Sequence, residues 1–147
     1  MGEAATFETE EQVMFYDTDA GGVVHNIAYL RFIEKCRTLL GGKLGLDLKQ
    51  MAESGLYAVV VRTEIDYRKA AKLGDHLKIR GWLEEVDRVR FWCAFEITRE
   101  GDEQVLITCR QRLAMVKMPE GKPARLPQDF GLPAKGAKNR EGGSDRV

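Results

Sequence analysis

The sequence has few cysteines, and none are spaced like a disulfide pair or a zinc ligand pair. Cys36, Cys93 and Cys109 are an odd number, lie far apart and form no CxxC motif. This argues against a disulfide framework and against a metal site, so we expect neither. Cys36 falls on the apolar face of a predicted helix, and Cys93 and Cys109 alternate with core residues of predicted strands, so we expect buried small side chains rather than nucleophiles. Such cysteine usage is typical of a reducing, cytoplasmic compartment.

Net charge and long apolar runs are also lacking. Lysine plus arginine number 23, and so do aspartate plus glutamate. Nucleic acid is therefore not expected as a partner, because phosphate backbones are bound through an excess of positive charge. No stretch approaches the roughly 18 apolar residues of a membrane span, and the first residues lack the basic and apolar segments of an export signal. We expect a soluble, cytoplasmic protein.

The apolar content is sufficient for one domain with its own core. The chain has 147 residues, of which 44% are hydrophobic, and this fits a single domain of ordinary size. We expect a flexible N-terminus over residues 1–8 and a folded domain over residues 9–132. Residues 133–147 are rich in glycine, lysine and arginine without apolar periodicity, which predicts a mobile tail.

One long amphipathic helix is predicted near the N-terminal end of the domain. Apolar residues three or four apart begin after Asn26, the predicted N-cap, and end near the glycine pair 41–42. Residues 46–54 predict a short second helical turn. Alternation with a period of two predicts a strand over residues 9–16 and four more strands within residues 59–67, 77–84, 89–97 and 105–116.

The predicted fold class is α+β, with an antiparallel sheet of about five strands wrapped around one long helix. The connections over residues 73–75 and 86–88 are too short for the crossovers that parallel strands need. The sheet carries apolar residues such as Trp82, Trp92 and Leu106 on both faces. We therefore expect a second subunit to cover one face or edge, in a homodimer or homotetramer.

The segment over residues 15–29, FYDTDAGGVVHNIAY, carries the pattern most indicative of function. It places Asp17, Asp19 and two glycines directly before the helix. Amide groups at a helix start have no intrahelical partner and suit an oxygen that gains negative charge. A carboxylate close by can attack the same carbonyl or take a proton from water. Gly22 and Val23 are expected to contact the substrate, because glycine allows close backbone approach.

The motif Tyr16 to Val24, followed by Tyr29 and Glu34, resembles the signature of the 4-hydroxybenzoyl-CoA thioesterase family. These are hotdog-fold acyl-CoA thioesterases, and the most similar branch is the one associated with the bacterial Tol-Pal system. The resemblance extends from about residue 11 to 127. It implies hydrolysis of an acyl-CoA to a free acid and coenzyme A, with coenzyme A as part of the substrate and no separate cofactor.

The resemblance also implies residue roles. The family's catalytic carboxylate falls on Asp19, and the amides that polarise the thioester carbonyl fall near His25 and Asn26. Basic residues at the turn between the third and fourth strands, here Arg88 and Arg90, would meet the phosphates of coenzyme A across a subunit boundary. The sequence departs from the branch at His25-Asn26, where an aromatic residue followed by histidine is usual, and at Ala70, where proline is common. The first departure leaves open the acyl preference and the role of His25.

Other interpretations remain at this stage. Asp19 can stabilise its loop as a turn residue, and Asp17 is expected mainly to shape the loop. Glu64 and Asp66 can serve as the acid of another hotdog subclass, although their alternation favours an exposed face. A hotdog hydratase or dehydratase would need a histidine facing an acid, for which His25 and His76 are the candidates. A non-catalytic acyl-CoA sensor is the third alternative.

Overall fold

The structure is a computed structural model, and it describes residues 5–131. The predicted tail over residues 133–147 lies outside the described residues. The elements are β1 (Thr6–Gln12), a short 3-10 helix η1 (Phe15–Asp17), α1 (Asn26–Lys43), α2 (Leu48–Ser54), β2 (Leu56–Tyr67), β3 (His76–Val86), β4 (Arg90–Arg99), β5 (Gln104–Lys117) and β6 (Lys122–Pro123).

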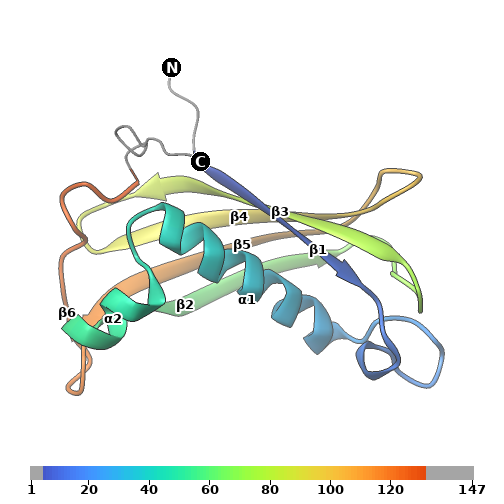
Figure 1. Ribbon diagram of the computed structural model, residues 1–147, viewed down its shortest axis with the longest axis horizontal. Helices are drawn as coiled ribbons and strands as arrows, with labels where there is room; N and C mark the ends of the chain where they lie inside the picture. The colour runs from blue at the N-terminus through green and yellow to red at the C-terminus, as the bar shows by residue number, and fades with distance from the viewer. Residues whose placement is uncertain (1–4, 132–147) are drawn as a thin grey trace.

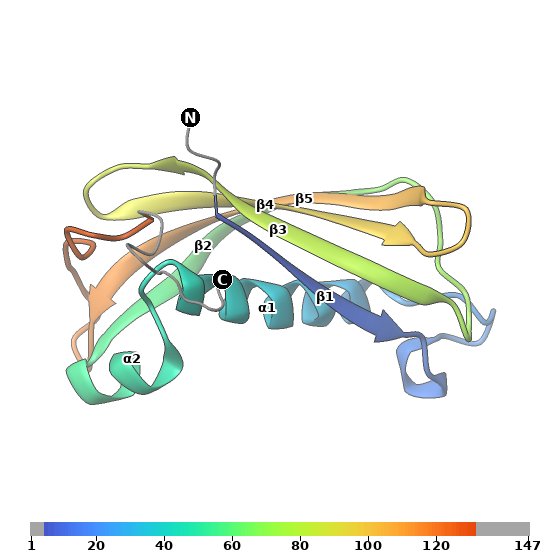
Figure 2. The same cartoon turned by 45° about the horizontal axis from the view of Figure 1, so that its top comes forward.

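The strands form one antiparallel sheet in the order β1-β3-β4-β5-β2, with the short β6 paired to β5. The sheet is curled, and α1 lies along its concave face (Figures 1 and 2). β1 and β2 are its edges, because β1 pairs only with β3 and β2 only with β5 among the described strands. The predicted α+β arrangement is confirmed.

Helix α1 forms because its apolar side chains recur every three or four residues on the face toward the sheet. Tyr29, Phe32, Ile33, Cys36 and Leu40 are all at most 3% exposed. Both predicted ends are off by a short distance. The N-cap is His25 rather than Asn26, and the helix continues through both glycines to Lys43. Among residues 5–131, no helix has the length and apolar character needed to cross a bilayer.

The first strand differs from its prediction. It spans Thr6–Gln12 instead of residues 9–16, so residues 6–8, expected in a flexible terminus, pair with β3. Residues 13–16 leave the sheet because the Asp17 carboxylate accepts a hydrogen bond from the Met14 amide at 2.9 Å and closes η1. As a result Phe15 and Tyr16, apolar in pattern, are 81% and 74% exposed.

The core between α1 and the sheet contains the three cysteines, as predicted. Burial raises the pKa of the Cys36 thiol to about 11 and those of Cys93 and Cys109 to about 12. Such thiols are poor nucleophiles because the reactive thiolate is scarce. Gly81 of β3 permits the tight packing there, since a Cβ at this position would lie 2.8 Å from the Phe95 ring and 3.1 Å from the Cys36 sulfur.

Aromatic residues divide between the two sheet faces. Phe91 and Phe95 are buried in the core. Trp82 and Trp92 are half-buried on the other face. There the guanidinium of Arg80 lies 4.8 Å from the Trp82 ring, and that of Arg110 lies 4.1 Å from the Trp92 ring. Cation–π contacts of this kind let large aromatic side chains lie at a surface.

Candidate active site

An open cleft lies between the start of α1 and the end of β2, and we call it the Asp19 cleft. Its volume is about 700 Å³. The lining combines the loop before α1, the first turn of α1 and the segment that leaves β2. The lining residues are Asp19, Val23, Val24, His25, Asn26, Ile27, Tyr29, Tyr67, Arg68, Lys69 and Ala70.

The loop before α1 is held in place by the segment that precedes β3. Val23 forms a β-bridge with Lys72, and the Val24 amide donates to the Ala71 carbonyl at 2.9 Å. Gly22 has a φ of +79°, a left-handed conformation that favours glycine. Gly22 is not among the cleft-lining residues, whereas Val23 is. The structure thus gives Gly22 a conformational role and leaves Val23 facing the cleft.

Asp19 is exposed and lines the cleft. Its Oδ1 accepts a hydrogen bond from the Gly21 amide at 2.9 Å, which is the turn interaction expected of an aspartate in this position. Among residues 5–131, no donor is bonded to Oδ2. One oxygen therefore orients the carboxylate while the other remains available to a ligand.

Asp17, the first acid of the motif, has a different environment. It is 1% exposed, receives the Met14 amide on Oδ2 and forms an ion pair with Arg31 through Oδ1. It also fixes the helix start, because its carbonyl accepts the His25 amide at 3.0 Å. The prediction that Asp17 shapes the loop is confirmed.

His25 caps α1 through its side chain. Nδ1 accepts a hydrogen bond from the Ala28 amide at 3.2 Å, so in the neutral ring the proton lies on Nε2. The backbone amide of His25 is engaged by Asp17 and is not free for a substrate oxygen. Within the described chain, the unpaired amides of this first turn are those of Asn26 and Ile27. The expected amide pair therefore shifts by one residue toward the helix.

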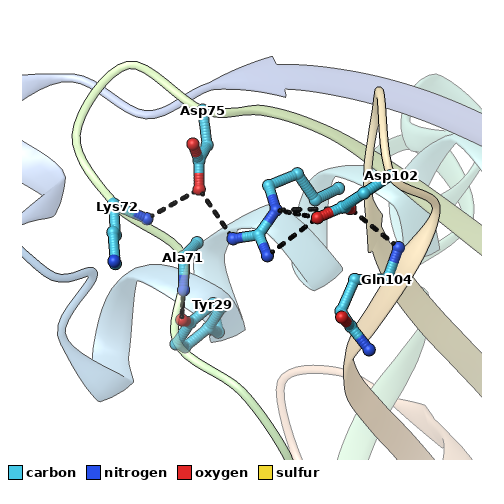
Figure 3. A network of polar contacts seen from close by, with 7 residues as sticks. Tyr29, Ala71, Lys72, Asp75, Asp102 and Gln104 are labelled. Atoms are coloured by element: carbon cyan, nitrogen blue, oxygen red, sulfur yellow. Dashed lines mark hydrogen bonds and ion pairs between the residues drawn. The ribbon is translucent and has the colours of Figure 1, made fainter.

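The opposite wall of the cleft is braced by a polar network (Figure 3). The buried Tyr29 hydroxyl accepts a hydrogen bond from the Ala71 amide at 2.9 Å, and burial raises the pKa of this phenol. Asp75 Oδ2 accepts the Lys72 amide at 2.9 Å and pairs with Arg99 at 3.3 Å. The segment that supports the loop is thus tied to the sheet.

Sequence reasoning missed three residues of this wall, Tyr67, Arg68 and Lys69. Tyr67 is the last residue of β2, Arg68 and Lys69 follow it, and all three line the cleft. Among residues 5–131, neither Arg68 nor Lys69 forms a salt bridge. The two adjacent cations after a strand were the available signal. Only the tertiary structure shows that this strand end faces the helix start.

Arg88 and Arg90 lie far from the Asp19 cleft within one chain. Arg90 begins β4, whose other end at Arg99 contacts Asp75 beside the cleft. Nine residue steps along a strand correspond to about 30 Å. Figures 1 and 2 place the turn between β3 and β4 at the opposite end of the sheet from the start of α1. The structure therefore does not bring these arginines to Asp19 of the same chain.

The remaining acids and histidine of the alternative interpretations lie outside the cleft. Glu64 forms ion pairs with Arg62 and Arg110 on the outer face of the sheet, and hydrogen bonds from both arginines help to lower the pKa of its carboxyl group. His76 is exposed at the start of β3 and does not line the cleft. Among residues 5–131, no three His, Cys, Asp or Glu side chains form a metal-binding group.

Comparison with known proteins assigns the fold and motif to a family. The chain matches the Thioesterase-like superfamily over residues 13–132 and belongs to that family. The predicted resemblance to hotdog thioesterases and the predicted hotdog fold are confirmed at this level. Assignment to the 4-hydroxybenzoyl-CoA and Tol-Pal-associated branch stays a prediction.

Two curated relatives and one solved structure illustrate the similarity. A 1,4-dihydroxy-2-naphthoyl-CoA hydrolase of Synechocystis is 31% identical over 129 residues, covering 85% of this chain and 91% of the relative. Acyl-CoA thioesterase YbgC of Haemophilus influenzae is 33% identical over 124 residues, covering 84% and 90%. The crystal structure of a 1,4-dihydroxy-2-naphthoyl-CoA thioesterase from Synechocystis superposes with a TM-score of 0.76 at 29% identity, covering 84% and 91%.

Proposed function

We propose that the protein is an acyl-CoA thioesterase that hydrolyses its substrate to a free acid and coenzyme A. The observation that supports this most strongly is the convergence of Asp19 and the unpaired amides of Asn26 and Ile27 on one cleft. The names of its relatives, which hydrolyse acyl-CoA thioesters, support the same reaction.

In this mechanism the thioester carbonyl oxygen binds at the start of α1. The amides of Asn26 and Ile27 donate to it, and the positive end of the helix dipole favours the negative charge that develops during attack. Asp19 either takes a proton from the water that attacks the carbonyl carbon, or attacks that carbon itself as a nucleophile. In both routes the C–S bond breaks and coenzyme A leaves as the thiolate, which takes up a proton. In the nucleophilic route water then hydrolyses the acyl–aspartyl anhydride to the free acid. His25 positions the amides by capping Ala28 and holds the first turn in place.

The coenzyme A part of the substrate is anionic, and two sets of cations can meet its phosphates. Arg68 and Lys69 line the same cleft as Asp19 and need no second chain. Arg88 and Arg90 reach such a ligand only from another subunit. A homo-oligomer is compatible with the edge strand β2, where Val59, Val60 and Val61 are each at least 38% exposed. Size-exclusion chromatography with light scattering would measure the oligomeric state.

The decisive experiment is a thiol-release assay over short, long, branched and aromatic acyl-CoAs, with the wild-type protein and Asp19→Asn. The panel includes 1,4-dihydroxy-2-naphthoyl-CoA, because the Synechocystis relative is named as a hydrolase of this thioester. The Haemophilus influenzae relative is named only as an acyl-CoA thioesterase, so the other acyl groups are tested as well. We expect Asp19→Asn to lower kcat at least about a hundredfold for the preferred substrate. Near-normal turnover by this variant would remove Asp19 from the mechanism.

The same panel separates the alternatives. A hydratase would add water to an enoyl-CoA without releasing thiol, and a sensor would bind acyl-CoA without turnover. The geometry favours hydrolysis over hydration because His25 uses Nδ1 for the helix cap and His76 lies outside the cleft. Release of thiol from none of the substrates would contradict the proposed function.

A further inference from the structure

A second cavity, of about 220 Å³, lies toward the other end of α1. It is enclosed by the second half of α1, by α2 and by the concave face of β2, β4 and β5. Figures 1 and 2 both place α2 beside the start of β2, away from the loop that carries Asp19. Within residues 5–131, no residue lines both this cavity and the Asp19 cleft. We call it the Arg37 cavity.

Most of the cavity wall is apolar. Its lining includes Leu44, Leu46, Met51, Ala58, Phe91 and Leu113. The volume corresponds to roughly seven groups of the size of a water molecule or a methylene. The cavity therefore suits a short apolar chain and is too small for coenzyme A.

Among the described residues, Arg37 is the one arginine in this wall, and most of the N–H groups of its guanidinium have no partner. It is half-buried and donates from Nη1 to Gln111 Oε1 at 2.7 Å. Gln111 is 3% exposed, and its Nε2 donates a hydrogen bond to Thr63 Oγ1 at 3.1 Å. A guanidinium carries five N–H donors, and Arg37 forms no salt bridge with any acid of residues 5–131.

A cation in a half-buried, largely apolar wall is costly without an anion. Burial lowers the pKa of the Arg37 guanidinium, while the charge of Glu34, one turn earlier on α1, raises it. Glu34 lies at the cavity but outside ion-pair distance. Because Glu34 is itself negative, it repels a dianion such as a phosphate monoester more strongly than it repels a monoanion.

We propose that the Arg37 cavity binds a monocarboxylate with an apolar tail of about six to eight carbons. The carboxylate pairs with the free N–H groups of Arg37, a planar geometry that guanidinium favours, and the tail lies among the leucines. The proposal does not rest on the proposed hydrolysis. A free acid is also what that hydrolysis would release, so the test must separate the two sites.

The test is calorimetric titration of octanoate into the full-length protein. We expect saturable binding to the wild type, and Arg37→Gln to weaken it roughly tenfold or more, the fold-change that loss of a charged hydrogen bond produces. Arg80→Gln is the matched control, because Arg80 lies against Trp82 on the other sheet face. With 1-octanol, which has the tail without the charge, Arg37→Gln should change the affinity little.

A second variant keeps the test informative if Arg37→Gln does not fold. Ala58→Phe retains the guanidinium and fills the space for the tail, and it should also weaken octanoate binding. Asp19→Asn should leave octanoate binding unchanged while hydrolysis is lost, so that each proposal can fail alone. The cavity proposal would be overturned by absent octanoate binding, by equal affinities in the wild type and both cavity variants, or by loss of binding in Asp19→Asn.

Discussion

Mutation of Asp17 should lower the stability of the fold, whereas mutation of Asp19 should lower activity, because only Asp17 is buried. Asp17→Ala removes the acceptor of the Met14 amide and the partner of Arg31. Water screens part of the ion pair, since the Arg31 side chain is 53% exposed. The loss therefore arises mainly from hydrogen bonds to a buried carboxylate and should be about 2–3 kcal/mol in the free energy of unfolding.

For a chain of this length, that loss corresponds to a fall in Tm of about 5–10 °C. Thermal unfolding followed by circular dichroism would measure it. In a double-mutant cycle with Arg31→Ala, the coupling energy should be about 1 kcal/mol, since the two side chains interact directly. A Tm for Asp17→Ala within about 2 °C of the wild type would refute the assigned role of the buried carboxylate.

Asp19→Asn is the matched comparison. An asparagine Oδ1 can still accept the Gly21 amide, and the side chain is exposed. Stability should therefore change by less than about 0.5 kcal/mol, while thioester hydrolysis is lost. If both variants lost stability equally, the main role of Asp19 would be to stabilise the turn through Gly21. Its proposed catalytic role would then lack support.

Three further predictions concern the cap and the core. His25→Ala should cost about 1 kcal/mol through loss of the helix cap, and His25→Asn should restore most of it; chemical denaturation of both variants measures the difference. Gly81→Ala should cost about 1–3 kcal/mol, because the added Cβ meets the Phe95 ring, and an unchanged midpoint in urea would contradict that packing. The three buried thiols should resist a thiol reagent near pH 8 in the folded protein and react once it is unfolded. Because folding raises their pKa values above the ordinary 9.0, the stability they contribute is present below pH 9 and declines as pH rises toward 11–12; rising stability over that range would exclude this linkage.

The local sequence pattern was sufficient for the elements that have strong periodicity. Helix α1 and strands β2 to β5 follow from apolar spacing, because a buried face requires a fixed period whatever its neighbours are. The ends were less accurate where a side chain acts at short range. The strand β1 ends early because the Asp17 carboxylate closes η1, and α1 begins at Asn26 because His25 takes the cap position.

The sequence by itself determined the class of fold and the position of the motif before α1. It also separated the two acids of the motif, with Asp17 predicted to shape the loop and Asp19 predicted to be the catalytic carboxylate. Only the tertiary structure decided which strand end faces that motif, since the sheet order β1-β3-β4-β5-β2 depends on long-range pairing. That order brings Tyr67, Arg68 and Lys69 to Asp19 and leaves Arg88 and Arg90 at the far end. It also encloses Arg37 in a cavity, because burial depends on what packs from distant parts of the chain.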